Sequence, residues 1–117
     1  MKNNENTINY KDKEYKVVFN INVIQALQDE YGSFDKWTKL VQPVKEGVES
    51  DLKALTFAFK EALNEGIDIE NEENGTDIKP LTLKQVGRII TELGIANANK
   101  KLQDVVVEST KDDEKNV

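Results

Sequence analysis

The feature that most constrains the fold is a helical pattern of apolar residues in the middle of the chain. These residues recur at spacings of three and four, which places their side chains on one face of an α-helix. They are Leu52, Leu55, Phe59, Ala62 and Leu63. Ser50 and Asp51 precede this apolar stripe and can cap the helix. We expect the helix to run to about Asn64 and to bury the stripe in a mainly α core.

Two shorter helices are expected before the central one. Asn20 or Asn22 can cap the first of them, and Gly32 is a typical terminator at its end. Ser33 can cap the second, which stops at Pro43 because proline cannot continue a helix. The spacing of apolar residues in both segments fits one buried face.

Two more helices are expected after the central one. Thr82, followed three residues later by Gln85, forms a capping box, in which side chains satisfy free backbone groups at the helix start. Gly94 ends this helix, and the last helix is expected to reach about Glu108. Residues 109–117 are charged and carry no apolar pattern, so we expect a disordered charged tail there.

The N-terminal residues 7–19 alternate between apolar and polar side chains, as expected for strands with one buried face. The alternating apolar residues are Ile8, Tyr10, Tyr15, Val17 and Phe19. A polar turn over residues 11–14 divides the segment, so the sequence predicts a β-hairpin, which must pack on another element to be stable. The expected fold class is therefore mainly α: a single domain over residues 1–108, with four to five helices and a small N-terminal β-hairpin.

Residues 65–80 are acidic and end at Pro80, and we expect a solvated acidic loop there. A small hairpin around Asn74 and Gly75 is a variant of this prediction, because Asn-Gly favours tight hairpin turns. A calcium-binding loop is a second interpretation. Its spacing fails, because placing Gly75 at the sixth loop position puts Leu81 at the twelfth, where a bidentate glutamate is required.

The composition argues against most classes of enzyme. The 117 residues include no cysteine and no histidine, which removes thiolate nucleophiles, the common catalytic triads and the usual zinc sites. We therefore expect no enzymatic activity, no catalytic residues, no cofactor and no metal. The formal charge is −6, and Arg88 is the single arginine. Because phosphate backbones and anionic lipids require a surplus of cations, neither nucleic acid nor a membrane is expected as a partner.

Two aromatic residues differ in their expected roles. Trp37 lies on the apolar face of its helix, which favours a position in the core. Phe57 falls outside the central apolar stripe, beside Lys53 and Lys60 on a helical wheel. It is either covered by the hairpin or a neighbouring helix, or exposed as a contact for a partner. Aromatic residues are enriched in protein interfaces, so Phe57 is the candidate partner-binding residue.

The same residues leave two further functional classes open. Residues 82–107 have the outline of a helix-turn-helix, which would make the protein a DNA-binding regulator. Its second helix carries only Lys100 and Lys101 as basic residues, which is little for a recognition helix. An acidic nucleic-acid mimic that inhibits a host enzyme is the other alternative. Such a mimic needs carboxylates spaced along a surface, whereas several of those here are bunched in one segment and the tail.

The order of the predicted elements supplies a resemblance to a known family. It is carried by the opening hairpin, a helix ending in Glu-Tyr-Gly, a Ser-Phe start with a following tryptophan, the central helix, and a Leu-Thr-Leu helix start. In this order the chain resembles the tail assembly chaperones of long-tailed phages and of prophages in Gram-positive bacteria. The segments are 7–19, 22–32, 33–37, 51–63 and 81–87, and the likeness extends over roughly residues 7–107.

The resemblance implies a non-enzymatic scaffold that acts during virion assembly in the cytoplasm of the bacterial host and is absent from the mature virion. Its implied partners are the tape measure protein and the tail tube protein, with self-association as a further possibility. Such a protein covers the long apolar helices of the tape measure protein and helps to recruit tube subunits around it. The family has no fixed motif from which binding residues could be transferred to this chain.

Overall fold

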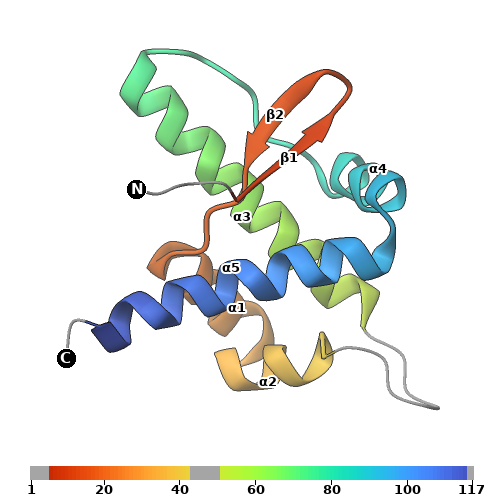
Figure 1. Ribbon diagram of the computed structural model, residues 1–117, viewed down its shortest axis with the longest axis vertical. Coiled ribbons are helices and arrows are strands. Elements are labelled where there is room, and N and C mark those ends of the chain that lie inside the picture. The colour runs from red at the N-terminus through yellow and green to blue at the C-terminus, as the bar shows by residue number, and fades with distance from the viewer. Residues whose placement is uncertain (1–5, 43–50, 116–117) are drawn as a thin grey trace.

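Five helices and one two-stranded hairpin make up the part of the chain that the structure describes (Figure 1). This computed structural model describes residues 6–42 and 51–115, with side chains up to Ser109. The expected fold class, a mainly α domain with an N-terminal hairpin, is confirmed. The elements are β1 (Thr7–Tyr10), β2 (Lys13–Lys16), α1 (Ile21–Tyr31), α2 (Phe34–Leu40), α3 (Leu52–Asn74), α4 (Leu83–Leu93) and α5 (Ile95–Lys115).

The hairpin is shorter and tighter than the sequence predicted. Tyr10 pairs with Lys13, so the turn consists of Lys11 and Asp12 alone rather than of residues 11–14. Both turn residues adopt positive φ values, 51° and 65°, as in the type I′ turn that matches the twist of the strands. The turn therefore forms without the glycine that usually supplies this conformation.

The chain leaves the sheet directly after β2 and packs onto α3. Val17 and Phe19 are buried there, as their alternation predicted, although they belong to no strand. The backbone N–H of Val18 donates a hydrogen bond of 3.2 Å to the carbonyl oxygen of Ala62 in α3. The hairpin is thereby anchored to the central helix.

The capping residues predicted for the first two helices are confirmed. The side chain of Asn20 accepts hydrogen bonds from the backbone N–H groups of Asn22 and Val23, and the N–H of Gly32 closes α1. Ser33 caps α2 in the same way. The predicted stop at Pro43 lies outside the described residues.

The predicted end of the central helix at Asn64 is wrong, because α3 continues to Asn74. The acidic loop expected over 65–80 is consequently helical in its first ten residues, and the variant hairpin at Asn74 does not form. Two physical reasons account for the extension. Glutamates in this segment are good helix formers, and Ile67 continues the buried face one turn beyond Leu63. Gly75, with φ of 66°, ends the helix in the left-handed conformation.

Two asparagine side chains direct the return of the chain from α3 to α4. Asn71 accepts a hydrogen bond from the N–H of Ile78 and donates one to its carbonyl oxygen, both at 3.0 Å. Asn64 does the same for Leu81, at 2.7 Å and 3.0 Å. The segment between α3 and α4 is therefore held along the side of α3 by side-chain amides.

The last two helices begin as predicted. Thr82 and Gln85 form the complete capping box, and Gly94 ends α4. The predicted end of α5 near Glu108 is wrong, because the helix continues to Lys115. The disorder expected for residues 109–117 stays a prediction. These residues contain neither glycine nor proline, and a helix already formed grows by one hydrogen bond per residue.

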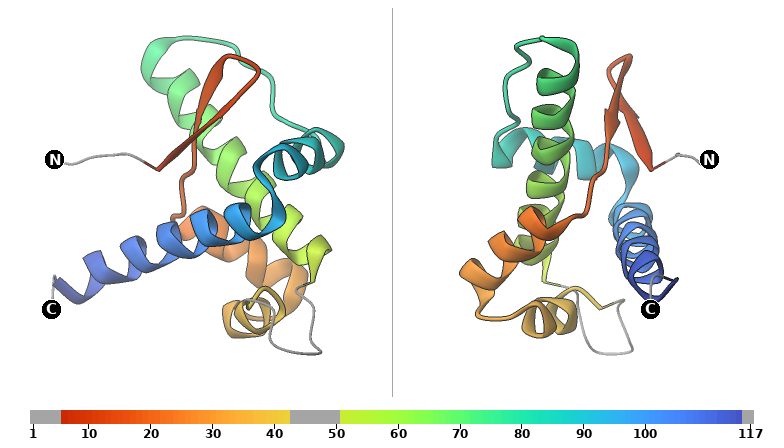
Figure 2. Two further views of the ribbon diagram at one scale, coloured as in Figure 1. Left: turned by 45° about the vertical axis from the view of Figure 1, so that its right-hand side comes forward. Right: turned by 90° about the vertical axis from the view of Figure 1, so that its left-hand side faces the viewer.

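The core surrounds α3, and the hairpin and α5 lie on one side of it in the right-hand view of Figure 2. Trp37 is fully buried as predicted, and its indole N–H donates to the carbonyl oxygen of Ala54 at 3.1 Å. Asn99, on the buried face of α5, donates to the carbonyl oxygen of Val41 at 3.0 Å. These two bonds tie the neighbourhood of α2 to α3 and to α5.

Candidate protein-binding site

Four helices place a large apolar side chain at their first residue, where it remains exposed. The fractions exposed are 67% for Ile21, 49% for Leu52, 51% for Leu83 and 48% for Ile95. For Leu52 this corrects the prediction that it belongs to the buried stripe of the central helix. A residue in the first turn can fit the helical spacing and still project past the neighbouring elements.

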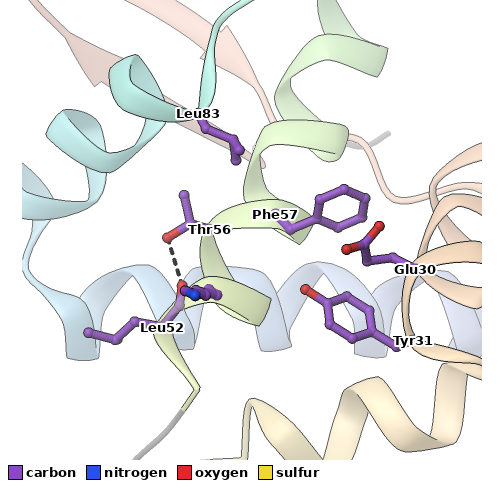
Figure 3. Close-up of a pocket in the computed structure, with 7 residues that line it drawn as sticks. Glu30, Tyr31, Leu52, Thr56, Phe57 and Leu83 are labelled. Carbon is purple, nitrogen blue, oxygen red and sulfur yellow. Dashed lines mark hydrogen bonds between the residues drawn. The ribbon is translucent and has the colours of Figure 1, made fainter.

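Two of these four residues line the same hollow on the surface. Leu52 contributes from the start of α3 and Leu83 from the start of α4, while the end of α1 closes the third side (Figure 3). The hollow has a volume of about 440 Å³. We call it the Phe57 hollow, and it is lined by Glu30, Tyr31, Leu52, Lys53, Thr56, Phe57 and Leu83.

The sequence left open whether Phe57 is covered or exposed, and in the structure it is partly both. Its side chain is half-buried, so neither the hairpin nor a helix covers it fully. The ring meets Tyr31 of α1 edge-on, with centroids 5.8 Å apart and planes at 81°. The ammonium group of Lys60 lies 5.4 Å from the ring centroid. One part of the ring is therefore held by its neighbours, and the ring also lines the hollow.

The polar groups of the hollow stand beside this apolar surface. The hydroxyl of Thr56 donates a hydrogen bond of 2.7 Å to the carbonyl oxygen of Leu52 and is thereby satisfied within α3 (Figure 3). Burial raises the pKa of Tyr31, and the negative charges of Glu30 and Asp51 raise it further. The phenol of Tyr31 consequently keeps its proton at neutral pH and can donate a hydrogen bond at the edge of the hollow.

This arrangement suits the binding of an apolar side chain. Exposed leucines and an aromatic pair provide contact area, and charged or hydroxyl groups at the edge can orient a ligand. Sequence reasoning found Phe57 but not Tyr31 or Leu83 as its neighbours in a site. For Leu83, the signal that was available is an apolar residue directly after the capping residue Thr82.

The other candidate motifs have the following positions. The carboxylates of residues 68–73 lie along the last turns of α3, and the described residues contain no group of three or more potential ligands placed to hold a metal ion. In the α4–α5 pair, Lys100 is bonded to Asp104 at 3.3 Å. Among the described helices, none combines the length and apolar character that crossing a membrane requires.

Comparison of the chain with protein-family models, with curated proteins and with solved structures finds no match. The kind of site must therefore be judged from the residues that line the hollow. It is an open, apolar hollow between three helices of a small acidic helical protein. This is the kind of surface that receives side chains of a protein partner.

Proposed function

We propose that the protein is a phage tail assembly chaperone, a non-enzymatic scaffold that binds the tape measure protein and aids assembly of the tail tube. In this proposal it acts in the bacterial cytoplasm during virion assembly and is absent from the finished particle. The proposal rests on the resemblance in the order of the sequence elements over residues 7–107. The partners are the tape measure protein and the tail tube protein, and a second copy of the chain is a further partner.

The structural observation that supports the proposal is the Phe57 hollow. A tape measure protein has long apolar helices, and an amphipathic helix binds by placing side chains from one face into an apolar groove. Leu52 and Leu83 flank a half-buried aromatic pair in the hollow. In the proposal, one apolar side chain of the tape measure helix enters between them and displaces water from their exposed surface.

Co-expression with the tape measure protein encoded in the same genome tests the proposal. The unmodified chain is expected to co-purify with it and to keep it soluble. Leu83→Ala and Phe57→Ala are expected to weaken the complex by about thirtyfold or more, because truncation of a central anchor in an interface costs about 2 kcal/mol or more. Chemical denaturation of each variant alone must show a loss well below the roughly 3–5 kcal/mol of a fully buried phenylalanine.

Ile95→Ala supplies a matched control for Leu83→Ala. Both residues open a helix, and they are exposed to nearly the same degree, 48% and 51%, but only Leu83 lines the hollow. Equal loss of binding in the two variants would remove the hollow from the proposal. Failure of the unmodified chain to bind the tape measure protein would remove the chaperone function itself. A very long helical reading frame directly downstream of the gene is the accompanying genomic expectation.

A further inference from the structure

A second hollow, of about 260 Å³, lies between the tip of the hairpin and α4. It has no lining residue in common with the Phe57 hollow. Its lining includes two lysines and two tyrosines from the hairpin, and the single arginine of the chain from α4. We call it the hairpin-tip hollow, and the residues that matter here are Tyr10, Lys11, Lys13, Tyr15, Arg88 and Ile89.

The register of the hairpin explains why these side chains gather. Residues paired across two antiparallel strands point to the same face of a sheet. Ile8, which is buried, pairs with Tyr15, and Tyr10 pairs with Lys13, so all four side chains share the inward face. That face is apolar near the core and becomes cationic towards the turn at Lys11.

The cations of this hollow are not neutralised by the protein. Within residues 6–42 and 51–109, whose side chains are described, Lys11, Lys13 and Arg88 form no ion pair with a carboxylate. The ammonium groups of Lys11 and Lys13 each lie 5.6 Å from the centroid of a tyrosine ring, Tyr10 and Tyr15 respectively. The three cations make this hollow a local positive patch on a chain whose acidic residues outnumber its basic ones by 22 to 16.

We propose that the hairpin-tip hollow binds a carboxylate side chain from an acidic segment of a partner protein. The guanidinium group of Arg88 can hold a carboxylate through two parallel hydrogen bonds, and the two ammonium groups complement its charge. Ile89 and the tyrosine rings offer apolar surface to the carbon stem of a glutamate or to a neighbouring side chain. The ligand therefore combines a carboxylate with an apolar body.

A nucleic acid strand and a phosphate group each fit this hollow less well than a single carboxylate. A net charge of −6 repels a nucleic acid strand, whose charges are dense and extend far beyond the hollow. A phosphate group carries more charge than a carboxylate and is usually held by free backbone N–H groups at a helix start. At the start of α4, the side chain of Thr82 already occupies the backbone N–H of Gln85.

Fluorescence anisotropy with labelled peptides tests this proposal on the full chain. The probe is a short peptide with two glutamates flanking a phenylalanine, and its control has glutamine in place of each glutamate. We expect the acidic peptide to bind at least about fivefold more tightly than the neutral one. Arg88→Gln and Lys13→Gln are each expected to weaken its binding by about fivefold, the upper range for one solvent-exposed charge pair.

Lys84→Gln is the matched control, because Lys84 is an exposed cation of α4 that does not line the hollow. Unchanged binding in this variant supports the proposal, and a loss equal to that of Arg88→Gln overturns it as a general effect of charge. Equal affinity for the acidic and neutral peptides also overturns it. Tighter binding of inorganic phosphate or of a single-stranded oligonucleotide than of the peptide overturns it as well. Leu83→Ala is expected to bind the peptide normally, which separates this site from the Phe57 hollow.

Discussion

The contact between α3 and β2 allows a prediction whose sign can be worked out from the structure. Gly66 faces β2, and a Cβ atom placed on it would lie 2.7 Å from the backbone carbonyl oxygen of Lys16. Ordinary contacts begin near 3.4 Å, and the obstructing atom belongs to the backbone, so the helix and the strand must separate. Overpacking of this kind costs about 1–3 kcal/mol. The better helix propensity of alanine returns about 1 kcal/mol.

Gly66→Ala is therefore expected to lower the free energy of unfolding by up to about 2 kcal/mol, and each kcal/mol lost lowers Tm by roughly 4 °C for a domain of this size. Gly87→Ala is the matched control. It lies within α4, and a Cβ atom there would have no heavy atom within 4 Å. It is expected to raise stability by about 0.5–1 kcal/mol.

Thermal melts and urea denaturation, followed by circular dichroism, measure both changes. An increase in stability for Gly66→Ala similar to that for Gly87→Ala would refute the close approach of α3 to β2. It would also remove one support for a central helix that continues past Asn64. Opposite signs in the two variants are the expected result.

Three further changes test other parts of the structure by the same unfolding measurements. Thr82→Ala removes the acceptor for the N–H of Gln85 and is expected to cost about 1 kcal/mol, whereas Thr82→Ser keeps the cap. Asn64→Ala removes both hydrogen bonds to the backbone of Leu81 and is expected to cost about 1–3 kcal/mol; no loss would contradict that link. The pKa of Tyr31 is raised in the folded protein, by burial first and then by neighbouring carboxylates. The unfolded chain therefore loses the phenolic proton first, and the free energy of unfolding falls as the pH rises above 10.0. Tyr31→Phe is expected to flatten this fall, and an unchanged pH profile would show that Tyr31 does not contribute to it.

The sequence was sufficient for features that depend on neighbouring residues. Capping by Asn20, Ser33 and Thr82 involves atoms two or three residues apart, so its signal lies within one short segment. The burial of Trp37 followed from helical spacing in the same way. These local rules were enough to place the start of each predicted helix near its observed position.

The features that were missed depend on contacts between distant segments. Local helix propensity favours the extension of α3, but the extended helix also needs Gly66 to accommodate Lys16 and Asn71 to hold the returning chain at Ile78. Charged residues alone suggested a loop there, because composition does not reveal such partners. The candidate site shows the same limit, since helical spacing identified Phe57 as unusual but could not reveal that the starts of α3 and α4 meet beside it.

The two hydrogen bonds between Asn64 and Leu81 close an excursion of the chain, since the two residues are 17 positions apart. Near the closure, Gly66 and Ile67 are packed against the rest of the protein, but the exposed tip around Gly75 can change in length at small thermodynamic cost, because doubling a flexible loop costs only about 0.6 kcal/mol. At its tip, a Cβ atom on Gly75 would meet nothing within 4 Å. Gly75 lines neither hollow, so a fluorescent or affinity label inserted after it would leave both hollows open, which makes this tip a practical attachment point on the protein.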